Sequence, residues 1–327
     1  MCNSAASVRH PYAVGETPPA YREPESGTGD GGADAGTDAG TDGGAEAARR
    51  RRKGGYPPLP EPLAVPVIDN HTHFDFREGP EVSIADALDA AEAAGVRGAV
   101  QVGTDLASSR FTAEIVEQDH RLLGAVALHP NDAPLLAGAG TLDAALEEIE
   151  RLAAGPRIRA LGETGLDYFR TGEDGRGSQL ASFRRHIDIA KRLGKALQIH
   201  DREAHDDVVA TLLADGAPDR VVLHCFSGDA GLARICNEHG WYMSFAGTVT
   251  FRNAENLREA LLVADPALVL TETDAPFLTP HPFRGRPNAA YLVPYTVRAM
   301  AGILDTDLDA LCARLTENTE AVYGAWI

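Results

Sequence analysis

The chain has 327 residues, of which 44% are apolar, enough for a sizeable core in one large domain or two ordinary ones. Its 30 basic and 48 acidic residues give a net charge of −18, which argues against a broad basic surface for polyanions, so any nucleic-acid contact must be local. The four cysteines show neither metal-type nor disulfide-scaffold spacing, and no segment approaches the roughly 18 apolar residues of a membrane span. We therefore expect a cytoplasmic protein without a membrane partner, and no feature indicates an obligate protein partner.

The first segment, residues 1–62, differs in composition from the rest of the chain. Gly, Asp, Ala, Thr and Pro dominate it, as in GTGDGGADAGTDAGTDGG, and it offers almost nothing large and apolar to bury. It ends in the proline-rich stretch YPPLPEP, which is typical of a stiffened linker. We predict a disordered, acidic and glycine-rich extension over 1–62, followed by one folded domain over 63–327.

Eight apolar, β-rich runs follow in chain order, separated by helix-like segments. The predicted strands cover residues 65–73, 98–103, 122–130, 158–167, 196–200, 220–226, 241–247 and 268–276. Intervening segments such as TLDAALEEIERLAAG place apolar residues three and four positions apart, which predicts amphipathic helices. This alternation is typical of βα units around a parallel sheet.

Eight strand–helix units in about 265 residues match a single-domain (β/α)8 TIM barrel, although an open doubly wound sheet has the same local pattern. The polar residues favour the closed barrel. Nearly all of them stand at the C-terminal ends of runs, and they come from at least five different strands. One barrel mouth can gather such residues, whereas an open sheet would spread them along its edge.

Four histidines at these strand ends are candidate metal ligands. His71 and His73 lie two positions apart, and residues i and i+2 of a strand point to the same side, so both imidazoles can hold one cation. His200 and His224 close the fifth and sixth runs and make a second cation plausible. His120, His186, His205 and His239 instead fall in helix-like segments, where we expect surface positions. Cys225 follows His224 and alternates away from it, which predicts a packing role.

Two carboxylates complete the predicted site. Two neighbouring cations need a shared anion, and Glu163, flanked by Gly162 and Gly165 in the fourth run, is the candidate bridge. Asp274 ends the last run, where it can ligate a cation and also accept a proton from an attacking water. We assign the catalytic role to Glu163 and Asp274. Imidazoles and carboxylates together accommodate Mg²⁺, Mn²⁺ or Zn²⁺.

Seven segments in order resemble the TatD family of metal-dependent deoxyribonucleases and hydrolases. They are DNHTHFD, ALHPNDA, LGETGLDY, LQIHDREA, VLHCFSGD, TETDAPFLTP with FRGRPN, and LTENTEAVYG, and the resemblance covers essentially residues 65 to 326. The resemblance implies two divalent cations, with Glu163 bridging them: His71, His73 and Asp274 on one, His200 and His224 on the other. It also implies that His129 and Arg284 bind the substrate phosphate. Asn131 and Asp132 depart from the family pattern, as does Phe277, which replaces the usual tyrosine.

The resulting functional hypothesis is phosphodiester hydrolysis by a water held between two cations. The resemblance implies 3′ to 5′ exonuclease action on DNA ends, with RNA as a further substrate. A first alternative keeps the site but assigns a small phosphoester, ester or amide as substrate. A second alternative is a non-catalytic protein that keeps the metal site for stability or binding.

Overall fold

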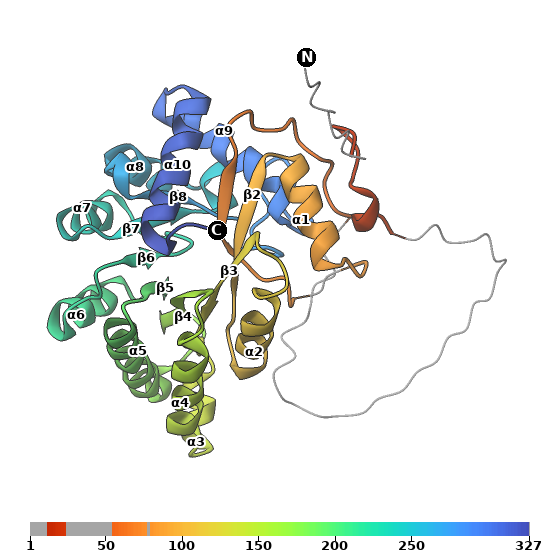
Figure 1. The fold of residues 1–327 in the computed structure, drawn as a ribbon. Helices are drawn as coiled ribbons and strands as arrows, with labels where there is room; N and C mark the ends of the chain where they lie inside the picture. The colour runs from red at the N-terminus through yellow and green to blue at the C-terminus, as the bar shows by residue number, and fades with distance from the viewer. Residues whose placement is uncertain (1–11, 24–53, 77–78, 327) are drawn as a thin grey trace, which may run out of the picture.

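The computed structural model describes residues 12–23, 54–76 and 79–326, and its centre is a barrel of eight parallel strands in sequential order (Figure 1). The first and last strands meet through backbone hydrogen bonds from Asp274 to His71 and from His73 to Ala275. The barrel prediction is therefore confirmed. The strands are β1 (Val67–Thr72), β2 (Val96–Val102), β3 (Leu122–Val126), β4 (Ile158–Asp167), β5 (Ala196–Arg202), β6 (Val221–Leu223), β7 (Tyr242–Phe245) and β8 (Val269–Thr271).

Helices surround the barrel and begin at residues that the sequence marks clearly. Ser83, Asp105, Asp229 and Asp307 each accept a hydrogen bond from a backbone N–H in the first turn of the following helix. Among the described residues, no helix combines the length and apolar character needed to cross a membrane. The helices are α1 (Ile84–Ala93), α2 (Leu106–Ile115), α3 (Ala133–Gly138), α4 (Leu142–Ala153), α5 (Glu173–Leu193), α6 (His205–Asp215), α7 (Ala230–His239), α8 (Glu255–Val263), α9 (Val293–Leu304) and α10 (Leu308–Tyr323).

Two apolar layers hold these elements together. The larger layer joins the strands to the surrounding helices and includes Phe183 of α5 and Met300 of α9. The smaller layer joins β-strand residues such as Ile68 and Val222 to Tyr323 and Trp326 at the C-terminal end of the chain. This second layer fills the interior of the barrel, so the polar groups at the C-terminal strand ends lie above a packed apolar core.

The prediction for residues 1–62 needs correction where the structure describes them. Tyr21, the last residue of the short helix Pro19–Tyr21, is 6% exposed and packs edge-on against Tyr56 and Tyr291. Arg286 donates to the carbonyl oxygen of Gly55 at 2.7 Å, which fixes the second described stretch. Both stretches are thus packed against the barrel because their tyrosines supply the apolar area that composition alone hides. The rest of the predicted disordered extension, 1–11 and 24–53, lies outside the described residues.

His186 is another correction, because it is fully buried in α5 rather than on the surface. Its Nε2 accepts a hydrogen bond from the backbone N–H of Leu128 at 3.2 Å, directly after β3. Nδ1 lies 2.8 Å from the carbonyl oxygen of Ser182. The imidazole therefore joins α5 to the segment that carries His129.

Candidate metal centre

The six predicted ligands come together at the C-terminal ends of the strands. His71 and His73 stand at the end of β1, Glu163 lies within β4, and His200 lies within β5. His224 directly follows β6, and Asp274 follows β8. Glycines let β4 and β5 approach: a Cβ at position 162 would lie 2.3 Å from Cβ of Gln198, and one at 165 would lie 2.1 Å from the His200 carbonyl oxygen.

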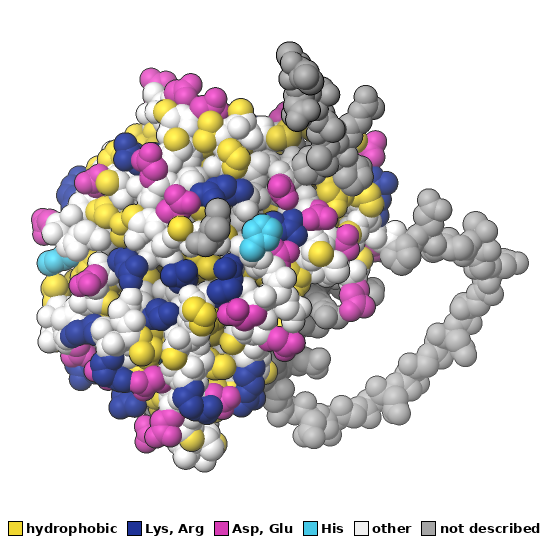
Figure 2. Space-filling model, viewed as in Figure 1, with side chains coloured by type: hydrophobic (Ala, Val, Ile, Leu, Met, Phe, Trp, Pro, Cys, Tyr) yellow, Lys and Arg dark blue, Asp and Glu magenta, His cyan; other side chains and the backbone are white. Residues whose placement is uncertain are grey.

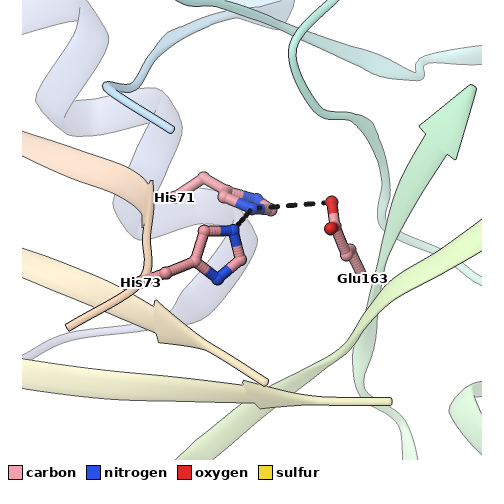
Figure 3. A group of neighbouring side chains, drawn as sticks. All are labelled: His71, His73 and Glu163. Atoms are coloured by element: carbon pink, nitrogen blue, oxygen red, sulfur yellow. Dashed lines mark hydrogen bonds and ion pairs between the residues drawn. The ribbon is translucent and has the colours of Figure 1, made fainter. Parts of the chain in front are cut away.

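The first group of ligands joins β1 to the loop after β8. Nε2 of His71 lies 3.2 Å from Nε2 of His73, 3.7 Å from Oε2 of Glu163 and 3.8 Å from Oδ1 of Asp274. His73 Nε2 lies 3.4 Å from the same Asp274 oxygen. Figure 3 shows the two imidazoles and the Glu163 carboxylate pointing toward one another. Four donor atoms thus surround one small volume.

The second group is arranged around Glu163. His224 Nε2 lies 2.6 Å from Oε2 of Glu163, and His200 Nδ1 lies 3.7 Å from the same oxygen. His129 Nε2 lies 3.4 Å from Oε1. His129, Glu163 and His200 also offer atoms that all lie within 4.8 Å of one another, as do His71, His73 and Glu163. Glu163 therefore belongs to both groups, the position that a bridging carboxylate requires.

Divalent cations fit this donor set. Two imidazole nitrogens 3.2 Å apart can be reconciled only by a proton on one of them or by a cation near both. Oε2 of Glu163 is buried and makes no hydrogen bond within the described residues, despite its short approach to His224. A buried carboxylate oxygen of this kind is costly unless a positive charge faces it. The residues are therefore suited to metal binding.

The pKa values of the site residues depend strongly on the charges of their neighbours. Burial and the neighbouring His224 hold the pKa of His71 well below its usual range. Burial acts on His73 in the same direction, but the hydrogen bond and charge of Asp274, together with Glu163, outweigh it and raise the pKa of His73 to about 9. Burial alone would raise the pKa of Glu163, yet His224 and His129 hold it well below the ordinary value. In the absence of a cation, protons on some of the histidines balance the carboxylates.

Three further carboxylates lie behind the ligands, and the sequence analysis assigned them no role. Glu272 Oε1 lies 3.2 Å from Nδ1 of His224, and Asp167 Oδ2 lies 3.2 Å from Nε2 of His200. Asp69 accepts hydrogen bonds from Thr273 at 2.6 and 2.9 Å, which ties β1 to the segment after β8. The available signal was position, since Asp167 and Glu272 stand in the same strand-end segments as Glu163 and Asp274. Such outer partners orient metal-binding histidines.

The two predicted substrate-binding residues lie in different surroundings. His129 lies within the second ligand group, so its geometry suits a metal ligand as well as a phosphate contact. Arg284 is exposed, and its guanidinium lies 4.3 Å from the centre of the Phe251 ring. Its role as a phosphate ligand stays a prediction.

Cys225 does not follow the strand alternation that we used to place it. β6 ends at Leu223, and Cys225 has a φ of 41°, so the backbone has left the extended conformation. Its backbone N–H donates to Glu272 Oε1 at 2.8 Å, and its thiol pKa is raised well above the usual value by burial and by Asp274 and Glu272. The predicted packing position between strands and helices is therefore wrong, and Cys225 borders the metal centre.

A half-open pocket adjoins the site next to His73. Its walls combine Phe74 and Phe76 of the barrel with Tyr21 and Tyr56 of the N-terminal stretches. Phe76 is 40% exposed, and its ring lies edge-on to both His73 and Phe277. An aromatic surface thus lies directly beside the metal ligands.

Comparison with known proteins gives a consistent result. The model of the family described as TatD related DNase matches residues 68–324. A metal-dependent hydrolase of Mycobacterium tuberculosis, TatD, is 45% identical over 79% of this chain and 98% of its own length, and the metal-dependent hydrolase YcfH of Escherichia coli is 34% identical over 79% and 95%. The crystal structure of YJJV, a TatD homolog from Escherichia coli, superposes with a TM-score of 0.72 at 26% identity and covers 79% of this chain and 98% of that one.

Proposed function

The chain belongs to the TatD family of metal-dependent hydrolases, and from that membership we propose that it hydrolyses phosphodiester bonds and shortens DNA from its 3′ ends. The observation that carries the proposal is the position of Glu163 between two groups of histidines, with Asp274 beside the first. Two cations placed symmetrically about a phosphate suit phosphodiester cleavage, because both the attacking and the leaving oxygens need charge stabilisation.

His71, His73 and Asp274 would hold one divalent cation, and His200 and His224 the other, with Glu163 shared. When bound, these cations would neutralise charge that develops on the phosphate. They would also lower the pKa of the attacking water, so that it loses its proton more readily. Asp274 is only partly buried and lies 3.4 Å from His73, so its carboxylate can accept the proton of the attacking water. Arg284 would pair with the phosphate oxygens through its guanidinium fork.

The aromatic side chains at the mouth support a substrate that carries bases. Phe76 and Phe277 lie edge-on to each other, with ring centres 5.6 Å apart, beside His73. Aromatic rings hold single-stranded bases by stacking, without sequence preference. Phe226, two residues after His224, is 2% exposed and packs on Phe245, so it is excluded from this role.

The experiment removes metal with a chelator, restores Mg²⁺, Mn²⁺ or Zn²⁺ separately, and follows shortening of labelled single-stranded DNA beside a generic phosphodiester. We expect metal-dependent shortening by the wild type and a loss larger than about 100-fold for Glu163→Gln, because an inner ligand matters more than an outer partner. Glu117→Gln, on the exposed surface, is the matched control. Turnover of the generic ester alone would remove DNA from the proposal but keep the two-metal hydrolase.

A second candidate is hydrolysis of a small phosphoester. The net charge of −18 favours it, since a long nucleic acid would be repelled from most of the surface. A small ester needs only the metal centre and the adjoining pocket. DNA shortening that weakens steeply with salt would decide against this candidate, because a small ester makes few phosphate contacts.

A further inference from the structure

Basic residues gather at the end of the barrel opposite the metal centre. Arg157 directly precedes β4, Arg159 is its second residue, and Lys195 and Arg220 directly precede β5 and β6. The register pairs Ala160 with Ala196 and Leu197 with Val221, so Arg159 stands level with Lys195, and Arg220 is offset from Lys195 by one residue. Arg157 precedes Arg159 by two residues. We call them the strand-start cations. Figure 2 shows Lys and Arg side chains gathered on the face where the C-terminus lies in Figure 1.

Two other cations at the same end of the barrel are paired with carboxylates. Arg97 at the start of β2 pairs with Glu320, and Arg121 before β3 lies 2.7 Å from carboxylate oxygens of both Asp89 and Asp119. Within the part of the chain that the structure describes, no carboxylate oxygen lies within 4.0 Å of a side-chain nitrogen of the strand-start cations. Four positive charges thus stand at this end of the barrel without a carboxylate partner among the described residues, in a chain of net charge −18.

Backbone carbonyls fix three of these side chains without neutralising them. Lys195 Nζ donates to the Gly155 oxygen at 3.1 Å, and Arg157 and Arg220 donate to backbone oxygens of His120 and Val322 at 2.9 and 3.0 Å. Burial, with the charges of Arg159 and Arg220, lowers the pKa of Lys195. The cations therefore repel one another while their positions are held.

Arg159 is the exception, because its side chain makes no hydrogen bond within the described residues. Its Nε is buried without a partner, as is Nε of Arg157. A buried guanidinium nitrogen without an acceptor is costly, and so is like-charge repulsion on three adjacent strands. An external anion beside these side chains would relieve the like-charge repulsion.

We propose that the strand-start cations bind a phosphate-type oxyanion, either free phosphate or the phosphate monoester of a nucleotide, at the end of the barrel remote from the metal centre. A guanidinium fork pairs bidentately with two phosphate oxygens, and an ammonium adds a compact point charge. The site is independent of the proposed phosphodiesterase activity.

The test uses the metal-loaded full chain and its variant Arg159→Gln, titrated calorimetrically with inorganic phosphate and, separately, with thymidine 5′-monophosphate. We expect the variant to weaken binding at this site at least about tenfold, which corresponds to ~1.4 kcal/mol. The matched control is Arg110→Gln, whose guanidinium is exposed and paired with Glu148. Tighter binding of one titrant identifies which of the two sources the site prefers.

Thermal unfolding supplies a readout that a merely structural arginine would not give. Because Arg159 repels Lys195 and makes no hydrogen bond, Arg159→Gln should raise the Tm in phosphate-free buffer and should abolish the rise in Tm that phosphate causes in the wild type. A lower Tm without phosphate would instead mark a structural role. That result, or phosphate affinity equal in the wild type and Arg159→Gln, overturns the proposal.

Discussion

Two of the metal-facing histidines, His200 and His224, are oriented by a carboxylate behind them. Glu272 is fully buried and lies 3.2 Å from Nδ1 of His224, whose Nε2 faces Glu163. This contact leaves Nε2 of His224 available toward the ligand group when the proton is on Nδ1. Glu272 thus positions a ligand without facing the substrate.

We expect Glu272→Ala to weaken metal binding by about 10- to 100-fold, as loss of an outer partner typically does. Glu272→Gln keeps an acceptor oxygen and should cost far less. Competition with a chromophoric chelator measures the affinity of each variant. Equal affinity for Glu272→Ala and the wild type would show that Glu272 does not orient His224.

The sequence predicted that the six candidate ligands would meet because each follows an apolar run, a pattern that can be read from the sequence alone. It did not predict the outer carboxylates or the proximity of His129 to Glu163, which depend on how neighbouring strands are registered. The placement of Cys225 failed for a related reason. The alternation of a strand applies only while the backbone stays extended, and β6 ends two residues before Cys225.

At the scale of elements, His186 connects α5 to the segment after β3 and makes this connection sensitive to pH. Burial lowers the pKa of His186 to about 4, from an ordinary value of 6.5. The unfolded chain therefore binds a proton that the folded chain excludes between these values, and stability falls as the pH falls from about 6.5 toward 4. The lowered pKa of this one buried imidazole reduces the free energy of unfolding by about 3 kcal/mol over that pH interval.

We expect His186→Gln to flatten this part of the pH profile while lowering stability at pH 7, where the neutral imidazole accepts from Leu128. Urea unfolding at about pH 5 and pH 7, with chelator present in all samples, measures the difference between the two proteins. The contradicting outcome is a pH dependence that is the same in both, which would place the titrating group elsewhere.

The N-terminal stretches are elements of the fold, although they precede the segment that the family model matches. Tyr21 fills the space between Tyr56 and Tyr291, with ring centres 4.6 and 5.1 Å away. We expect Tyr21→Ala to lower the free energy of unfolding by about 3 to 5 kcal/mol, the range for removing a buried aromatic ring. Denaturant unfolding beside the exposed control Val14→Ala measures it, and a cost below about 1 kcal/mol would show that this stretch is not packed in solution.

At the scale of the whole molecule, the barrel was predictable because eight apolar runs and the helices between them repeat the same local pattern. Each of the eight strands overlaps its predicted run and extends at most two residues beyond it, but most strands end earlier than predicted, β8 by five residues. The packed N-terminal stretches were not predictable in this way. Their tyrosines are few and stand among glycines and prolines. The average composition of the segment therefore does not reveal the tyrosines that pack against the barrel.

The charges of the molecule are also distributed unevenly between the two ends of the barrel. The carboxylates and histidines of the candidate metal centre occupy the C-terminal ends of the strands, while cations that have no carboxylate partner among the described residues begin β4, β5 and β6 at the other end. A net charge of −18 therefore describes neither end of the barrel.

The central claim is that Glu163 joins two cation sites. Metal content per chain, determined by plasma mass spectrometry after equilibration with Mn²⁺ and removal of free metal, tests it most directly. We expect two bound cations in the wild type, and fewer than two in Glu163→Gln with the fold intact by circular dichroism. One cation or none in the wild type, or an undiminished pair in Glu163→Gln, would contradict the account.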